Sequence, residues 1–242
     1  MRAAFYTGTS GLVAFQNSMD VIGNNISNCS TVGYKAQKTA FQQLLASNMN
    51  DSTKPVQVGN GVRSVSSGIA LGEADYMPTQ GDLDLAISGD GWFCVQANGQ
   101  SEYTRDGSFA LSLSGGNAYL VNRDGAYVLD STGKQVTGAV DSKTNKADIG
   151  AMLNNVGVFT FSNPEALTPT SSNSYLSNAY TGTATAAAKG DYTVLKGYLE
   201  QSDVSLADEM AALITAQRGY QLSARVVQTA DEVEQTINSL RG

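Results

Sequence analysis

Three aspartates, Asp82, Asp84 and Asp90, are the residues whose type and spacing come closest to a chemical site. Clustered carboxylates can bind a metal ion or act as a general acid and base. The Asp82-x-Asp84 pair, however, lacks the glycine spacing and the further ligands of a calcium-binding loop, and Phe93 stands where such a loop needs its glutamate. Aspartate is common in turns. We therefore interpret all three as turn and strand-end residues.

The remaining composition excludes most other catalytic chemistry. The 242-residue chain contains no histidine, so histidine-based acid–base catalysis and metal ligation are ruled out. It has no glycine-rich phosphate loop and no serine-nucleophile motif. Its two cysteines, Cys29 and Cys94, are distant in sequence, and we interpret them as small, semi-buried side chains. We expect no enzymatic activity, no metal, no cofactor and no small-molecule substrate.

The charge balance argues against nucleic acid as a partner. Lysine and arginine number 15 and aspartate and glutamate 22, a formal net charge of −7, whereas phosphate binding needs clustered cations. No apolar run approaches the ~18 residues of a membrane span. The N-terminus lacks the continuous apolar stretch of a cleavable signal peptide. If the protein leaves the cytoplasm, we expect a route that reads another signal.

The elements that would position any functional residue begin with a helical pattern over residues 1–45. It is interrupted at NCSTVGYK, where turn chemistry places Gly33 at a positive φ. A second apolar cluster, Phe41, Leu44 and Leu45, follows the interruption and is assigned to this helical region. Apolar residues before the interruption recur at steps of three and four, the spacing of a narrow helical seam, and are Leu12, Phe15, Met19, Ile22 and Ile26.

Residues 46–198 show a β pattern instead. Short apolar or alternating runs, among them GWFCVQ, SFALSL and AYLV, are separated by Asn-Gly, Asp-Gly and Gly-Gly pairs. Such pairs between apolar runs are the strongest short-range signals of a β-hairpin. The pattern favours an antiparallel sheet, with the Ser/Thr/Ala-rich residues 168–192 mostly extended or loop-like.

The last region, residues 199–242, is predicted to contain one long helix. Ser205 to Asp208 has the Ser-x-x-Asp form of a capping box. Gly219, the only glycine between Leu206 and Leu240, either permits a close helix approach or weakens the helix by about 1 kcal/mol. The apolar residues recur at helical steps and are Leu206, Met210, Leu213, Tyr220, Val226, Val233, Ile237 and Leu240.

Length decides how these regions combine. A helix from Leu206 to Leu240 would be about 52 Å long, whereas a compact β domain of ~140 residues would measure only about 35–40 Å across. The β domain cannot cover that helix, so we expect its seam to pair with the N-terminal seam and with neighbouring copies. The predicted fold is α+β: long N- and C-terminal helices pairing as a coiled-coil-like stalk, with an inserted antiparallel all-β domain.

Three long segments resemble the signatures of the bacterial flagellar axial proteins, the rod and hook family. The N-terminal signature resembles SGLVAFQNSMDVIGNNISNCSTVGYKAQKTAFQQLL, and the central signature resembles GDLDLAISGDGWFCV with YTRDGSF. The C-terminal signature resembles GYLEQSDVSLADEMAALITAQRGYQLSARVVQTADEV. The resemblance is closest to the basal-body rod proteins, especially the distal rod subunit. A short stretch between Leu45 and Val62, and Asp203 in place of a common asparagine, leave a proximal rod or short hook protein as alternatives.

The resemblance implies a structural protein of the flagellar basal body, outside the cytoplasmic membrane. Such subunits are exported through the flagellar type III apparatus without signal cleavage. They polymerise with copies of themselves and with other rod and hook proteins into a hollow tube that transmits torque. Residues 1–45 and 199–242 would form the axial core, and residues 46–198 the outer domain. Phe41 and Leu45 resemble the motif that docks on the export gate, with local packing as the alternative. Another extracellular filament subunit is the more distant rival.

Overall fold

The structure, a computed structural model, describes residues 2–48, 57–72, 74–97, 99–139, 148–170, 173–188 and 190–241. The chain divides into two compact units. The helical unit comprises Met1–Ser27, Gln37–Ser67 and Ser205–Gly242. The β unit comprises Asn28–Ala36 and Gly68–Val204.

Helices lie at both ends of the chain and strands fill most of the middle. The helices are α1 (Arg2–Ser27), α2 (Ile149–Asn154) and α3 (Leu206–Arg241), with a 3₁₀ turn at Pro164–Ala166. The strands are β1 (Gln37–Gln43), β2 (Ser47–Asn48), β3 (Gln57–Val58), β4 (Val62–Ile69), β5 (Tyr76–Pro78), β6 (Leu85–Gly89), β7 (Trp92–Ala97), β8 (Gln100–Thr104), β9 (Ala110–Ser114), β10 (Asn117–Val121), β11 (Tyr127–Val128), β12 (Thr137–Ala139), β13 (Val158–Thr160), β14 (Thr168–Pro169), β15 (Ser174–Leu176), β16 (Thr185–Ala186), β17 (Tyr192–Lys196) and β18 (Tyr198–Glu200).

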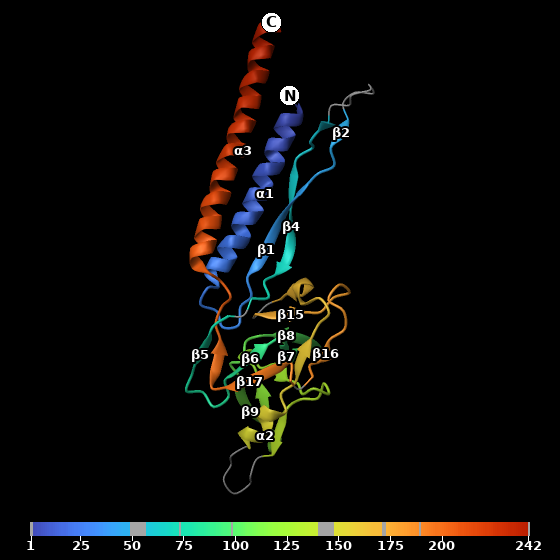
Figure 1. The fold of residues 1–242 in the computed structure, drawn as a ribbon, viewed down its shortest axis with the longest axis vertical. Coiled ribbons are helices and arrows are strands. Elements are labelled where there is room, and N and C mark those ends of the chain that lie inside the picture. The colour runs from blue at the N-terminus through green and yellow to red at the C-terminus, as the bar shows by residue number, and fades with distance from the viewer. Residues whose placement is uncertain are drawn as a thin grey trace. The chain divides into compact units, whose positions relative to one another are not determined.

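The helical unit pairs the two ends of the chain. α1 and α3 run antiparallel, with the N- and C-termini at the same end of the pair (Figure 1). The prediction of an α+β fold, with two long terminal helices that pack together and an inserted antiparallel β domain, is therefore confirmed. α3 has 36 residues and α1 has 26, so α3 is about 15 Å longer at 1.5 Å per residue. α1 cannot cover α3 along its whole length.

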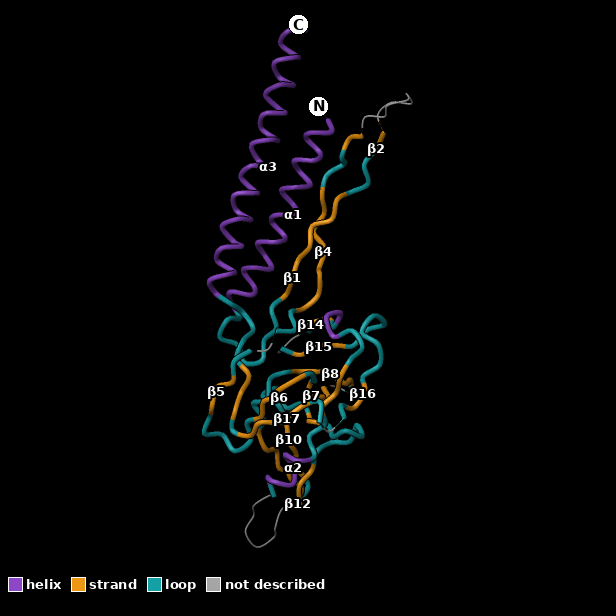
Figure 2. The backbone as a smooth tube through the Cα atoms, viewed as in Figure 1, coloured by secondary structure: helices purple, strands orange, loops and turns teal. Residues whose placement is uncertain are grey.

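The helical prediction for Phe41 to Leu45 is wrong. Phe41 belongs to β1, which pairs with β4 and lies beside α1 (Figure 2). So short a run of apolar side chains cannot be assigned to a helix or a strand by periodicity alone, and here pairing with β4 decides in favour of the strand. The division at residues 45 and 198 into an axial core and an outer domain stays a prediction about the assembled protein.

Helix α3 begins at its predicted cap. The backbone N–H of Asp208 donates to the Ser205 hydroxyl at 3.4 Å, the Ser205 half of a capping box. Asp208 and Glu209 also lie in the first turn, where the helix dipole favours negative charge. These local signals favour a helix that starts at this position.

The β unit is built on antiparallel pairs. Its main path runs β12-β10-β11-β7-β8-β15-β14, with β9 on β10, β13 on β7 and β16 on β13. The Gly115-Gly116 pair joins β9 to β10 with φ angles of 60° and 83°, the positive values that a tight hairpin requires. β17 pairs with β6, and β18 with β5. The largest cluster of buried apolar residues includes Leu85, Ile87, Phe93, Val95, Leu120, Val128 and Val158.

A second apolar cluster in the β unit contains ionisable groups. Cys94 and Tyr103 face each other there on paired strands β7 and β8, beside Trp92 and Tyr175. Burial raises the pKa of the Cys94 thiol from 9.0 to about 11, against the lowering effect of hydrogen bonds with Ser101 and Tyr103. Burial and the Cys94 charge raise the pKa of Tyr103 from 10.0 to about 12.

These shifts predict alkaline destabilisation of the β unit. Between pH 9 and 11 Cys94 stays protonated in the folded chain but ionises in the unfolded chain, so the free energy of unfolding falls as pH rises. The shift corresponds to a loss of about 1 kcal/mol by pH 10 and of about 2–3 kcal/mol by pH 11. Urea unfolding at steps from pH 8 to pH 10 measures it, with Cys94→Ala as the comparison. An equally steep decline in Cys94→Ala would contradict the assignment.

Candidate functional site

Small side chains let α1 and α3 approach closely. A Cβ on Gly8 would lie 2.8 Å from Val227 Cγ2, and one on Gly11 would lie 3.0 Å from Ser223 Oγ. Ala216 of α3 is also buried. The buried residues of α1 recur at helical steps and are Gly8, Gly11, Ala14, Ser18, Ile22 and Asn25. The intramolecular contact is thus made mainly by small and polar residues rather than by the large apolar ones.

Gly219 of α3 provides the space for an aromatic ring of α1. A Cβ built on Gly219 would overlap the ring of Phe15. Phe15 also packs against Phe41 of β1, with ring centroids 5.2 Å apart. This contact links α3, α1 and β1, and it favours the close-approach role that the sequence left open for Gly219.

The effect of Gly219→Ala on the free energy of unfolding is expected to change sign when the Phe15 ring is removed. Gly219→Ala should lower the free energy of unfolding of the helical unit by about 1 kcal/mol, because overpacking outweighs the gain in helix propensity. In a Phe15→Ala background the same change should stabilise by about 1 kcal/mol. Gly23→Ala is the matched control, since a Cβ there meets nothing within 4 Å. Urea unfolding followed by helical circular dichroism measures all three. A Gly219→Ala effect equal to that of Gly23→Ala would contradict this packing.

Asn25 is a poor helix former, and its side-chain hydrogen bonds explain its place in α1. Its side-chain oxygen accepts from the backbone N–H of Gln37 at 3.0 Å, and its amide donates to the Gln37 carbonyl at 3.0 Å. The same amide group donates to Glu209 Oε1 of α3 at 2.9 Å. Asn25, which is 2% exposed, therefore joins α1, the first residue of β1 and the first turn of α3.

The predicted seam residues of α1 are more buried than those of α3. In α1, Ile22 is buried and the other seam residues, Leu12, Phe15, Met19 and Ile26, are half-buried. In α3 only Leu213 is half-buried, and the exposed seam residues are Leu206, Met210, Tyr220, Val226, Val233, Ile237 and Leu240. Most of the α3 seam therefore does not face α1 and is available to other partners.

The exposed apolar residues of α3 form two stripes. The first stripe is Leu206, Met210 and Ile214, which are 46–53% exposed. The second stripe is Leu222, Val226, Val233, Ile237 and Leu240, which are 45–82% exposed. At about 100° per residue, the first stripe lies roughly 80–160° to one side of Ala216, on the face that contacts α1, and the second stripe roughly 60–120° to the other side. α3 thus offers two apolar surfaces that point in different directions.

A buried charge cluster lies within the β unit. Glu200 is 1% exposed and bridges two cations: its Oε1 lies 2.7 Å from Lys35 Nζ and its Oε2 lies 3.1 Å from Arg105 NH1. Lys35 also donates to the Gly72 carbonyl at 2.7 Å. The sequence pattern did not predict this cluster, although Lys35 and Glu200 each follow an apolar neighbour in a chain with few charges.

The backbone beside this cluster requires a glycine at position 33. Its φ of 64° confirms the predicted positive value. A Cβ at Gly33 would also lie 2.5 Å from the backbone carbon of Arg105, too close for any side chain. The Gly33 N–H donates to the Glu200 carbonyl at 2.8 Å, so the turn after α1 is hydrogen-bonded to β18.

The three aspartates of the sequence analysis do not form a shared site. Asp82 and Asp90 are exposed, whereas Asp84 is half-buried. The Asp84 carboxylate accepts from the Thr79 hydroxyl at 2.6 Å, and its N–H donates to the Gly81 carbonyl. Asp84 therefore has the turn role expected for it.

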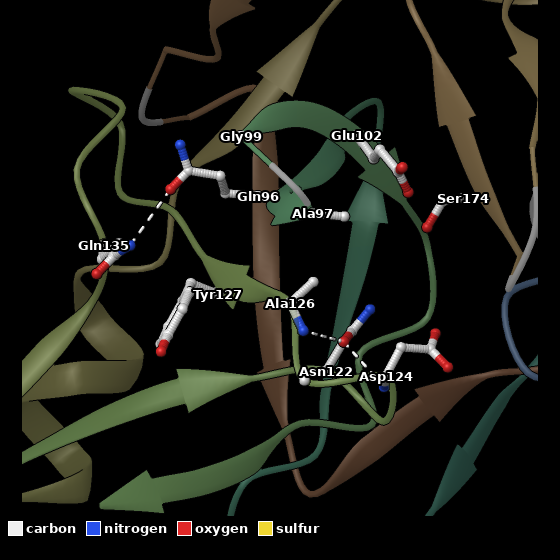
Figure 3. A pocket seen from close by; sticks show the side chains of 11 residues that line it. Gln96, Ala97, Gly99, Glu102, Asn122, Asp124, Ala126, Tyr127, Gln135 and Ser174 are labelled. Carbon is white, nitrogen blue, oxygen red and sulfur yellow. Dashed lines mark hydrogen bonds between the residues drawn. The ribbon is translucent and has the colours of Figure 1, made fainter. Parts of the chain in front are cut away.

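An open pocket of about 560 Å³ lies beside the β7–β8 hairpin and the turn that follows β10 (Figure 3). Its polar groups mainly hold local structure. Asn122 Oδ1 accepts from the N–H groups of Asp124 and Ala126, and Gln135 donates to Gln96 at 3.3 Å. We assign this pocket no chemistry.

Among the described residues, no helix is long and apolar enough to cross a membrane.

Comparison with known proteins places the chain. Three family models match in order: "Flagella basal body rod protein" at residues 5–35, "Flagellar hook protein FlgE/F/G D1 domain" at 86–158, and "Flagellar basal body rod FlgEFG protein C-terminal" at 195–240. The flagellar basal-body rod protein FlgG of Bacillus subtilis is 32% identical over 270 residues, covering 100% of both chains. The chain belongs to the flagellar basal-body rod protein family.

Other relatives match over nearly the whole chain and have related names. FlgG of Caulobacter vibrioides is 33% identical over 262 residues, covering 98% of this chain and 99% of its own. The flagellar hook-basal body complex protein FlhP of Bacillus subtilis is 29% identical over 269 residues, covering 100% of both. In this rod-family chain each matched segment supplies one member of the buried charge cluster: Lys35, Arg105 and Glu200.

Proposed function

We propose that this protein is a structural subunit of the bacterial flagellar rod that self-assembles through its terminal helices. Copies of the chain, together with other rod and hook proteins, form a hollow axial tube that transmits torque. Residues 1–45 and 199–242 contribute to the inner core, and residues 46–198 face outward. The role is mechanical, and the protein is not an enzyme.

The two apolar stripes of α3 carry this proposal. An exposed stripe of Leu, Met, Ile and Val side chains favours association, because burying each such side chain contributes about 1.5–3 kcal/mol. Since the stripes point in different directions, two different neighbours can bind one α3. Contacts of this heterologous kind build rings or open helical tubes rather than closed pairs.

Export through the flagellar type III apparatus, without a cleavable signal, follows from the same assignment. Phe41 and Leu45 are the proposed gate-docking residues, and they are 44% and 89% exposed. Phe41 also packs on Phe15, so local packing and docking both apply to it. We propose that the assembled protein lies in the basal body, outside the cytoplasmic membrane.

A rod subunit is favoured over a short hook protein. Relatives matched over 98–100% of this chain and 99–100% of their own are named rod proteins. The family model for the central segment also covers hook proteins, which keeps a hook role as the second candidate.

Deletion of the gene separates these roles. Basal bodies purified from the deletion strain should have an incomplete rod and no hook in electron micrographs, and the natural chain should restore both. A complete rod without a hook would favour the hook role. Normal flagella in the deletion strain would refute an axial role.

A further inference from the structure

We propose that the buried charge cluster of Lys35, Arg105 and Glu200 is a mechanical clamp. It fastens the chain segments that enter and leave the β unit to the sheets of that unit. The clamp gives the proposed rod function a means of bearing force, and it rests on that function for its biological purpose. Its existence rests only on contacts within the β unit.

The chain path shows why a clamp is placed here. The backbone passes between the two units after Ser27, Ala36, Ser67 and Val204. The β unit is therefore connected to the helical unit through three of its own segments: Asn28–Ala36, the residues from Gly68 onward, and the residues up to Val204. Any force carried along the backbone between the units reaches the β unit through these segments.

Lys35 and Glu200 connect all three segments. Lys35 lies in the first segment, its Nζ donates to the Gly72 carbonyl in the second, and it pairs with Glu200 near the third. Backbone hydrogen bonds reinforce the same connections. Asp203 N–H donates to the Tyr34 carbonyl at 3.0 Å, and Ala70 N–H donates to the Ala36 carbonyl at 2.7 Å.

Arg105 anchors this junction to the sheets. It follows β8 directly, and its guanidinium donates to Glu200, to the Ile87 carbonyl and to the Gly89 carbonyl of β6. The guanidinium carbon also lies 5.4 Å from the ring centroid of Trp92 in β7. One side chain therefore links Glu200 to three strands.

Glu200 is placed where strand peeling would begin. β18 is a three-residue strand that pairs only with β5 among the described elements, and Glu200 is its last residue. Tension applied from Val204 first loads the backbone hydrogen bonds of Asp203 and Gln201, and it then reaches β18 at Glu200. The Glu200 carboxylate must separate from both Lys35 and Arg105 before β18 can move. Breaking a buried ion pair is costly because it leaves buried charges without a partner.

Force spectroscopy distinguishes a clamp from a contact that only adds stability. In one set of full-length chains, Thr132→Cys and Gln228→Cys provide the attachment points, or handles, for pulling. Tension between them enters the β unit through the connecting segments. A second set carries handles at Ser114 and Ser162, so that tension bypasses them; Cys29→Ser is present in all. Each handle set is made in the natural chain, in Glu200→Gln, and in Leu120→Ala or Val128→Ala, whichever matches Glu200→Gln in equilibrium stability.

With the first handles, Glu200→Gln should unfold the β unit about a hundredfold faster at a given force than the natural chain, and faster than the stability-matched control. With the second handles, the two variants should be indistinguishable. Lys35→Met, which keeps the Arg105–Glu200 pair, serves if Glu200→Gln does not fold. Equal acceleration by the cluster variant and the control with the first handles would overturn the clamp. The assay uses single chains, so its failure would leave the rod assignment untouched.

Discussion

A chain that carries Ile214→Asp and Val226→Asp is expected to stay monomeric under conditions in which the natural chain assembles. Both side chains are exposed, at 51% and 45%, and one lies in each apolar stripe of α3. Losing the burial of two such side chains removes about 3–6 kcal/mol, which raises the concentration needed for assembly about 10²- to 10⁴-fold. Electron microscopy and sedimentation of the purified protein measure the effect.

The control for this double variant is Ala211→Asp with Thr236→Asp. These residues are also exposed on α3 but lie outside both stripes, so the pair adds the same charge without removing large apolar side chains. Circular dichroism should show both variants folded. Tubes from the Ile214→Asp/Val226→Asp chain at natural concentrations would refute the role of the stripes.

Glu200→Gln is expected to have the largest effect on stability. It leaves the ammonium of Lys35 and the guanidinium of Arg105 buried without their shared counter-charge, with side chains that are 3% and 10% exposed. Removal of one partner from a buried ion pair typically costs about 3–5 kcal/mol. Urea unfolding of the β unit, followed by Trp92 fluorescence, measures the loss.

Two comparisons make this result specific. Glu165→Gln changes an exposed carboxylate of the same unit and should alter the free energy of unfolding by less than about 0.5 kcal/mol. Lys35→Met should cost less in the Glu200→Gln background than in the natural chain, because the two changes remove one interaction. Additive losses would mean that the two residues do not form an energetic pair.

The sequence predicts the long elements well because their signals are local. The capping residues at Ser205 to Asp208 and the proline-free apolar pattern that follows define α3 almost to the residue. Glycine pairs mark the β9–β10 hairpin, and turn chemistry marks the positive φ of Gly33. Each of these features depends on neighbours a few positions away.

The contact between the helices could not be predicted in the same way. Apolar periodicity marks the largest side chains, and in α3 those lie mostly outside the intramolecular contact. The face that contacts α1 is made by residues such as Ala216, Gly219 and Ser223, which carry little hydrophobic signal. Which face of a helix meets which partner depends on shape complementarity, and that is absent from a single sequence.

The charge cluster is a third case. Lys35, Arg105 and Glu200 are separated by tens of residues, and pairing them requires the whole topology of the β unit. Their apolar neighbours were a usable hint, because a charge between Tyr34 and Ala36 is expensive to bury alone. Likewise, the strand at Phe41 depends on its partner β4, so spacing alone favoured the wrong element.

The proposed assembly requires that the two apolar stripes of α3 become buried between copies of the protein. Thiol labelling tests it directly, using Val233→Cys in a Cys29→Ser background and Thr132→Cys as the control for reagent access. Val233→Cys should react rapidly with a maleimide in the monomer and resist it in assembled tubes, while Thr132→Cys reacts in both. Equal reactivity of Val233→Cys in monomers and tubes would show that α3 does not join the subunits.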